Sequence, residues 1–393
     1  MDVQGRLRGG MAESPTAGDR GNMKYYRDLR DIKHLTVRER EALSCVTERF
    51  AFRVNEYYLS LIDWADPEDP IRRMVIPHAD ELKEWGCPDP SGEETYTVLP
   101  GLEHKYPSTV LLLVSNVCEC ICRYCFRKRI FMACQKELIR DIPAAVKYIA
   151  SRPEITNVLL TGGDPLVGAT RKLERIICEL RKIDHVKIIR IGTRMPVFNP
   201  YRIVNDRSLA DMISRYSLPD KRIYIMTHFS HSRELTEAAR AALDSLLKAG
   251  AILHNQCPLI RGVNDDAETL AELFRQLSYA GVTPYYLFQC RPALGNYGYT
   301  VPIEQGYEIY EGARARMSGL AKSMRYVMSH TTGKVEIVAR TSTQVYFKYH
   351  RATCDADSGR IVVCKSNPTA YWLDDYDEIA HPELMRYQAY GPD

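Results

Sequence analysis

The run Val110-Leu111-Leu112-Leu113-Val114 is a short apolar segment, and it is the first of a regular series. Stretches with apolar residues at helical spacing, such as 173–183 and 235–247, separate the successive members of this series. Strands that alternate with helices predict an α/β protein with a parallel sheet. Six such units favour a partial (β/α)6 barrel over a doubly wound sheet. The other five runs are residues 157–160, 187–191, 223–226, 251–254 and 285–288.

Polar residues and glycines cluster immediately after five of these runs. The carboxyl ends of the strands in a barrel meet at one face, and that face carries the chemistry. We therefore predict a functional site there, the alternative being ordinary solvated loops. The segments are Thr161-Gly162-Gly163-Asp164, Gly192-Thr193-Arg194, Thr227-His228, Asn255-Gln256 and Gln289-Cys290-Arg291.

The regions on either side of the series have a different character. Residues 25–98 are predicted to form a helical region, because Thr36 and Glu39 have the spacing of a capping box. Residues 99–322 are predicted to form the barrel. Residues 323–393 are predicted to form a loop followed by a small β-rich cap, which could take part in homo-oligomer formation.

Composition narrows the class of protein. Hydrophobic residues make up 45% and charged residues 26% of the chain, which is the balance of a soluble globular protein. The net charge of +3 is too small to indicate binding to nucleic acid or to a membrane. No apolar run approaches the roughly 18 residues of a membrane span. Residues 1–24 lack the apolar core of a secretory signal, so we expect a disordered tail, with Met11 or Met23 as alternative starts, and a cytoplasmic protein.

Four of the twelve cysteines lie close together, at Cys118, Cys120, Cys122 and Cys125. Such a cluster in a long chain indicates a metal or redox site and not a disulfide scaffold. Three thiolates spaced as Cys118-x3-Cys122-x2-Cys125 can bind three irons of a [4Fe–4S] cube and leave the fourth iron open. A zinc ion would need a fourth ligand, and Cys120 could supply it only in a cramped geometry.

These motifs resemble those of the radical S-adenosylmethionine (SAM) enzymes, and more narrowly those of the lysine 2,3-aminomutase family. Tyr124 provides the aromatic residue before the third cysteine. The further motifs occur in family order between about residues 100 and 340. They are His104-Lys105-Tyr106-Pro107, Phe126-Arg127-Lys128-Arg129, Leu160-Thr161-Gly162-Gly163-Asp164-Pro165-Leu166, Arg190-Ile191-Gly192-Thr193-Arg194, Thr227-His228-Phe229-Ser230-His231, Arg261-Gly262-Val263-Asn264-Asp265 and Pro284-Tyr285-Tyr286-Leu287-Phe288-Gln289-Cys290.

The resemblance assigns roles at the cluster. It implies that Cys118, Cys122 and Cys125 bind the cluster, while the amino and carboxylate groups of SAM chelate the open iron. It also implies that Gly162-Gly163-Asp164 receives the methionyl amine of SAM and that Tyr124 lies beside the adenine. Glycines permit close backbone approach, and an aspartate pairs with an ammonium group. The alternative for this segment is a tight turn with an N-capping aspartate.

Members of this family also carry pyridoxal 5'-phosphate (PLP) on a lysine. The matching position is Lys334, which follows Gly333 after the barrel, although a loop lysine is more commonly a surface charge. Lys105, next to His104, occupies the position of a basic contact to the phosphate. Arg127 matches the arginine that binds the substrate carboxylate. Without the resemblance, the run Arg127-Lys128-Arg129 would be interpreted as a solvated basic patch or a phosphate clamp.

The match is weakest at the substrate. Lysine-specific enzymes hold the distal ammonium with two aspartates, and Asp265 matches the first of them. The second is absent, because Val327 and Met328 stand at its position. Arg291 occupies a place where the lysine enzymes tend to have an acid. With one carboxylate retained, we predict a basic L-amino acid such as lysine as the substrate.

The implied activity is that of an isomerase, which moves an α-amino group to the β carbon. A 5'-deoxyadenosyl radical removes a hydrogen atom from C3, and PLP supplies the π-system for migration of the nitrogen. The expected partners are a small amino acid and an electron donor such as flavodoxin or ferredoxin, with neither nucleic acid nor membrane. The alternatives are a related radical reaction on glutamate, on arginine or on a protein-bound lysine. A more remote one is a non-catalytic iron–sulfur or zinc protein that binds nucleic acid, for which binding would depend strongly on salt.

Overall fold

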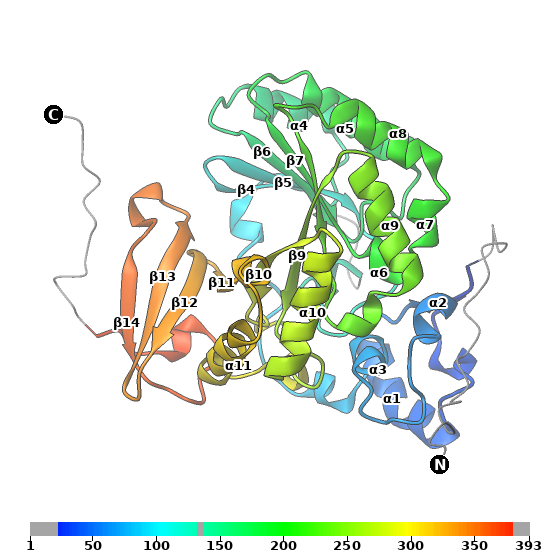
Figure 1. Ribbon diagram of the computed structural model, residues 1–393, viewed down its shortest axis with the longest axis vertical. Coiled ribbons are helices and arrows are strands. Elements are labelled where there is room, and N and C mark those ends of the chain that lie inside the picture. Colours follow the sequence, from blue (N-terminus) through cyan, green and yellow to red (C-terminus); the bar gives the residue numbers. More distant parts are fainter. Residues whose placement is uncertain (1–22, 132–136, 380–393) are drawn as a thin grey trace, which may run out of the picture.

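The computed structural model describes residues 23–131 and 137–379, and one long sheet runs through it (Figure 1). Its twelve strands follow chain order from β3 to β14. The six predicted strands all form, and they are neighbours that run parallel, as the sequence predicted. They are β5 (Thr109–Ser115), β6 (Asn157–Gly162), β7 (Ile188–Thr193), β8 (Ile223–Thr227), β9 (Ile252–Pro258) and β10 (Thr283–Phe288).

The helices between these strands cover the outer side of the sheet (Figure 1). This consecutive order, with no switch, is that of a partial barrel, and the ladder in the described residues stays open between β3 and β14. Asp266 caps α10 by accepting hydrogen bonds from the backbone N–H groups of Glu268 and Thr269. The helices are α4 (Ile142–Ala150), α5 (Thr170–Arg181), α6 (Met195–Phe198), α7 (Tyr201–Val204), α8 (Arg207–Tyr216), α9 (Glu237–Lys248), α10 (Ala267–Tyr279) and α11 (Ile303–Ala315).

The C-terminal region is rich in strands, as predicted, but it continues the main sheet and contains a strand where a loop was predicted around Lys334. After α11 the chain returns as β11 (Arg325–His330), which pairs in parallel with β10. The strands β12 (Gly333–Arg340), β13 (Gln344–Ala352) and β14 (Ile361–Lys365) then extend the same sheet with antiparallel pairing. The edge of β10 would otherwise expose unpaired backbone groups, and the C-terminal strands satisfy them. Lys334 therefore lies on a strand and not on a loop.

The N-terminal region packs against the segment that carries the clustered cysteines. It contains α1 (Val37–Arg49), α2 (Glu56–Leu59), α3 (Pro70–Val75) and the short ladder of β1 (Tyr25–Tyr26) with β2 (Val54–Asn55). The predicted capping box at Thr36 and Glu39 is present at the start of α1. Strands β3 (Thr97–Leu99) and β4 (Leu102–Tyr106) then lead antiparallel into β5.

Two expectations concern the ends of the chain and the membrane. The predicted tail at residues 1–24 lies outside the described residues except for Met23 and Lys24. Within the described ranges, no helix is both long and apolar enough to cross a membrane.

Candidate active site

A cavity of about 430 Å³ is lined both by residues within the parallel strands, such as Leu111, Leu159 and Arg190, and by the segments that follow their carboxyl ends. All five of the polar segments predicted to form a site contribute residues to its wall. Ten of the eleven predicted site residues also line it, so residues far apart in the sequence meet around one space. These ten are Lys105, Cys118, Cys122, Tyr124, Cys125, Arg127, Gly162, Gly163, Asp164 and Lys334.

The N-terminal region holds the cysteine segment in place. The backbone N–H groups of Ile121 and Arg123 donate to the carbonyl groups of Arg53 and Met74, at 2.8 and 2.9 Å. The buried guanidinium of Arg123 also donates to both carboxylate oxygens of Glu81, at 2.9 and 2.7 Å. Such a paired, desolvated contact fixes the orientation of the segment as well as its position.

The clustered cysteines fall into two groups. Cys118, Cys122 and Cys125 line the cavity, whereas Cys120 is fully buried in the hydrophobic core and does not reach it. All four are free thiols. Burial raises the pKa of the Cys125 thiol to about 11, so cluster assembly would have to displace protons. In the described part of the chain no three Cys, His, Asp or Glu side chains converge to hold a single metal ion. The three thiols facing one cavity have the donor chemistry that a [4Fe–4S] cube requires, since each cysteine binds a different iron.

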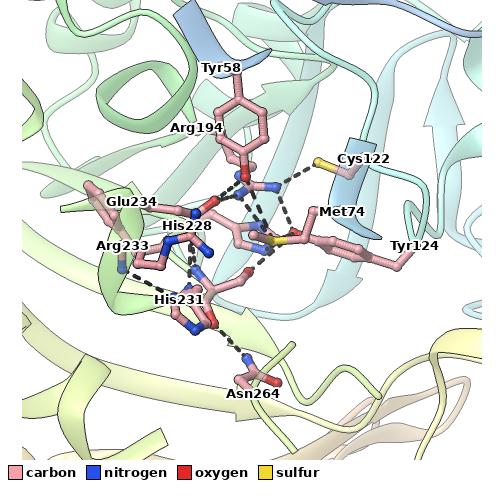
Figure 2. A network of polar contacts seen from close by, with 12 residues as sticks. Tyr58, Met74, Cys122, Tyr124, Arg194, His228, His231, Arg233, Glu234 and Asn264 are labelled. Carbon is pink, nitrogen blue, oxygen red and sulfur yellow. Dashed lines mark hydrogen bonds and ion pairs between the residues drawn. The ribbon is translucent and has the colours of Figure 1, made fainter. Parts of the chain in front are cut away.

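Arg194 connects the cysteine segment to the barrel (Figure 2). Its Nη1 donates to Cys122 Sγ at 3.0 Å and to the hydroxyl of Tyr124 at 2.6 Å. Its Nη2 donates to the carboxylate of Glu234, which is fully buried and also accepts from the hydroxyl of Tyr58. Every charge in this network is therefore paired. A guanidinium beside a cluster thiolate would also tune the reduction potential of a bound cluster.

The segment Gly162-Gly163-Asp164 packs directly against the cysteine segment. A Cβ atom added to Gly162, whose φ is +118°, would lie 2.2 Å from the carbonyl oxygen of Ser115. One added to Gly163 would lie 2.5 Å from that of Val117. The glycines are therefore required for contact between two backbone segments, whatever ligand the site binds.

Asp164 does not cap a helix, because α5 begins only at Thr170. Its carboxylate accepts hydrogen bonds from Thr193 Oγ1 and from the backbone N–H groups of Leu166 and Arg194, at 2.7–2.9 Å. Burial raises the pKa of this carboxyl to about 6, so the group is mainly ionised at neutral pH. An ionised carboxylate on the cavity wall suits an ammonium group, and its role toward SAM stays a prediction.

Lys334 lies at the start of β12, a strand far from the cysteine segment both in the sequence and in the order of the sheet. Its Nζ lies 4.6 Å from the ring centre of Phe288 and 5.2 Å from that of Tyr286, and it donates a long hydrogen bond to Ser329 Oγ. Burial first, and then the nearby cations Arg291 and Arg190, lower the pKa of its ammonium group well below the ordinary value. The lowered pKa favours the uncharged, nucleophilic form of the amine, which is the form that a covalent cofactor site needs.

Four further cations line the cavity around Lys334: Lys105, Arg190, Arg291 and Arg351. Their hydrogen bonds go to neutral oxygens and, among the described residues, none of them forms an ion pair with a carboxylate. The buried hydroxyl of Tyr106 in the same wall has no hydrogen-bond partner in the described structure. Unpaired charges of one sign around a cavity are suited to a polyanionic ligand such as a phosphate ester.

The run Arg127-Lys128-Arg129 is not a solvated surface patch. This result corrects one of the two interpretations that the run would have had without the family resemblance. Arg127 donates through Nε and Nη2 to Glu93, which Arg129 also contacts, and Lys128 pairs with Glu81. Arg127 and Lys128 are each only 6% exposed. Only Nη1 of Arg127 is left for a ligand, with a 3.5 Å contact to Thr161 Oγ1.

Asp265 is the predicted site residue that the structure does not bring to the cavity. It lies in the turn between β9 and α10, where its carboxylate accepts a hydrogen bond from the backbone N–H of Gly262 at 2.8 Å. The tight turn places this side chain in a local capping role instead of beside a substrate.

Comparisons with known proteins agree with this geometry. The model of the radical SAM superfamily matches residues 112–274. A protein of Aquifex aeolicus (strain VF5), provisionally named L-lysine 2,3-aminomutase, is 50% identical over 91% of this chain and 96% of its own length. The chain belongs to the lysine 2,3-aminomutase family of radical SAM enzymes. Its members are isomerases, and the radical SAM family uses a [4Fe–4S] cluster and SAM.

Two other relatives bear on the substrate. The L-lysine 2,3-aminomutase of Clostridium subterminale is 39% identical, over 76% of this chain and 71% of that protein. The glutamate 2,3-aminomutase of Clostridioides difficile (strain 630) is 36% identical, over 75% of this chain and 68% of that protein. These identities are too similar to decide between the two named substrates.

Several residues of the site were not assigned from the sequence. Arg190 and Arg194 lie in a quoted family motif, and their positions near strand ends were an available signal. Glu93 and Arg351, which line the cavity, and Glu234, which pairs with Arg194, lie outside the predicted strand ends, so no pattern in the sequence connected them to the site.

Proposed function

We propose that this protein is a PLP-dependent 2,3-aminomutase acting on a free α-amino acid. The observation that supports this proposal is that the three thiols and the buried amine of Lys334 line the same cavity of about 430 Å³. One wall suits a [4Fe–4S] cluster with SAM, and the other suits a cofactor held covalently by a lysine and electrostatically by cations.

Arg190 and Arg351 are the best placed to hold the phosphate of PLP. Arg351 is anchored by the hydroxyls of Ser108 and Thr109, at 2.7 and 2.9 Å, and Arg190 by Asn157 Oδ1 at 2.9 Å. Because these partners are neutral, both guanidinium groups keep their full charge for a ligand.

Other residues would orient the reactants and exclude water. Nη1 of Arg127 would contact the α-carboxylate of the amino acid, and Asp164 would contact the ammonium group of SAM. SAM on the reduced cluster would supply the radical, and PLP would supply the π-system for nitrogen migration. The α-amino group and one hydrogen of C3 exchange places, so the reaction needs no net oxidant or reductant.

The binding of nucleic acid is disfavoured by the same geometry. The cations that could have formed a basic patch are buried, and Arg127, Lys128 and Arg129 are each paired with a glutamate. A small flavin or iron–sulfur protein such as flavodoxin or ferredoxin is our proposal for the electron donor. A cytoplasmic location and assembly into a homo-oligomer stay predictions.

Anaerobic reconstitution tests the proposal. Protein supplied with iron, sulfide and PLP should convert one of the twenty amino acids to its β-amino isomer when SAM and dithionite are added. Borohydride treatment should attach PLP to Lys334. A protein that cleaves SAM but takes up no PLP would overturn the proposed function, as would isomerisation without PLP.

A further inference from the structure

The charged groups that line the cavity indicate the class of substrate. The carboxyl groups among them already have partners in the protein. Three carboxyl groups line the cavity in the described structure: Glu93, Glu103 and Asp164. Glu93 is engaged by Arg127 and Arg129, and Asp164 accepts from three donors. Burial, followed by the neighbouring Glu93, raises the pKa of Glu103 to about 8, which leaves it mainly protonated at neutral pH. Glu103 also lies 4.0 Å from Nη2 of Arg127, so each of the three carboxyl groups already faces a donor of the protein, whereas Arg291 pairs with no carboxylate among the described residues.

Arg291 differs from the two arginines assigned to the phosphate. Arg190 and Arg351 are anchored by residues at the first positions of β5 and β6 or just before them. Arg291 instead follows β10, and its guanidinium lies 3.7 Å from the ring centre of Phe126, the residue next to Cys125. It therefore occupies the side of the cavity that faces the cluster segment, where the substrate must lie between the two cofactors.

Arg291 retains most of its hydrogen-bonding capacity. Among the described residues, its guanidinium donates a single hydrogen bond, from Nη1 to Ser91 Oγ at 2.6 Å. Stacking on Phe126 leaves the edge of the guanidinium plane available for a bidentate contact with a carboxylate. No carboxylate pairs with it in the described structure, and a partly buried, unpaired charge is costly to keep unless a ligand neutralises it.

Phe126 also lies against Arg127, whose guanidinium carbon is 4.8 Å from the same ring centre. Two guanidinium groups thus lie against one aromatic side chain beside the cluster segment. An amino acid with a carboxylate at each end could contact both of them, with its α-carboxylate at Arg127 and its side chain at Arg291.

We infer that Arg291 is a specificity residue that binds a side-chain carboxylate, and that the substrate is an acidic amino acid of the glutamate or aspartate type. This inference rests on the proposed PLP-dependent function. It replaces the basic substrate predicted from Asp265, which does not line the cavity.

Binding to the PLP-loaded protein tests the inference without the radical step. The visible absorbance of bound PLP is followed during titration with L-glutamate, L-aspartate, L-glutamine, L-lysine and L-arginine. Glutamate or aspartate should bind most tightly. Arg291→Gln should weaken glutamate binding about ten- to a hundredfold, and it should affect glutamine much less. Arg291→Lys, which retains the charge without the planar fork, should restore part of the preference.

The controls separate the possible failures. Arg351→Gln should weaken PLP binding without changing the ratio of glutamate to glutamine affinity. Tighter binding of lysine or arginine by the wild-type protein would overturn the inference. Equal loss of glutamate and glutamine binding in Arg291→Gln would also overturn it, because Arg291 would then bind the α-carboxylate common to all amino acids. Failure to bind PLP at all would instead reject the proposed function.

Discussion

The cations around the cysteine segment and those in the rest of the cavity wall differ in their partners. Around the cysteine segment, Arg194 is paired with Glu234 and Arg123 with Glu81, so these cations are neutralised by carboxylates of the protein. Elsewhere in the cavity wall, Arg190, Arg291 and Arg351 have only neutral hydrogen-bond partners among the described residues. Paired charges hold segments of the protein together, whereas unpaired charges are available to a ligand. The difference shows which cations serve the fold and which serve binding, and the experiments below test that division.

The largest effect is expected at the cluster ligands. Cys122→Ala should abolish both the absorption near roughly 400 nm of the reconstituted cluster and the cleavage of SAM, because a thiolate ligand is lost. Cys120→Ala is the matched control, and it should retain both, since Cys120 lies in the core outside the cavity. A Cys120 variant that loses the cluster while a Cys118 variant keeps it would refute the ligand set.

Lys334 should be as necessary for covalent attachment of PLP as the cysteines are for the cluster. Lys334→Ala should eliminate covalent PLP attachment after borohydride reduction, while the cluster absorption stays unchanged, because the two groups bind to different walls. Lys348→Ala, a change at an exposed lysine of the neighbouring strand β13, should have no effect. Peptide mapping identifies the modified lysine, and PLP on any other residue would contradict the assignment.

Removing a member of the paired network of Arg194 and Glu234 should lower the stability of the folded protein. Arg194→Met leaves the buried carboxylate of Glu234 without its cation and should lower the free energy of unfolding by about 3–5 kcal/mol. The double variant Arg194→Met/Glu234→Gln should recover part of that loss, because it removes the stranded charge. Urea unfolding of the cofactor-free protein measures both. If the single variant were as stable as the wild type, the network would not be structural.

Removing a cation that has no carboxylate partner should affect ligand binding and not the stability of the fold. Arg351→Gln should leave the free energy of unfolding of the cofactor-free protein unchanged or raise it, since no carboxylate depends on Arg351. Its affinity for PLP should fall about ten- to a hundredfold through loss of a charged contact to the phosphate. Fluorescence titration with PLP gives the affinity. Strong destabilisation without a change in PLP affinity would remove the distinction between the two groups of cations.

The smallest effect concerns pH. The pKa of Glu103 is about 8 in the folded chain, and it is about 4.3 in an unfolded one. The folded state therefore holds the proton more tightly, and stability falls as pH rises between these values, by at most about 1.4 kcal/mol per pH unit. Glu103→Gln should flatten this dependence between pH 6 and 8 in urea unfolding. The exposed control Glu268→Gln should keep the wild-type slope, and an equal slope in Glu103→Gln would refute the protonation assigned here.

The order of the strands and the position of most site residues followed from local patterns. Apolar runs such as residues 110–114 form strands because their side chains are buried on both faces of a covered parallel sheet. Once parallel strands alternate with helices, their carboxyl ends meet at one face. Cys118 and Gly162 could thus be assigned to one site before any contact was known, whereas Lys334 was assigned to it only through the family resemblance.

Tertiary structure decided the partners of the charges, which no pattern in the sequence encodes. Asp265 and Arg291 both follow strands of the barrel. The carboxylate of Asp265 accepts a hydrogen bond within its own turn, whereas the side chain of Arg291 lines the cavity. Arg127 is paired with Glu93, from a region some 34 residues away in the chain. The sequence by itself determined the six parallel strands and the clustering of the cysteines, because hydrophobic periodicity and local spacing act over short distances, and the family resemblance supplied the candidate lysine. Only the folded chain decided which cations are neutralised and which remain for a ligand, because electrostatic pairing depends on distances between elements that are remote in sequence.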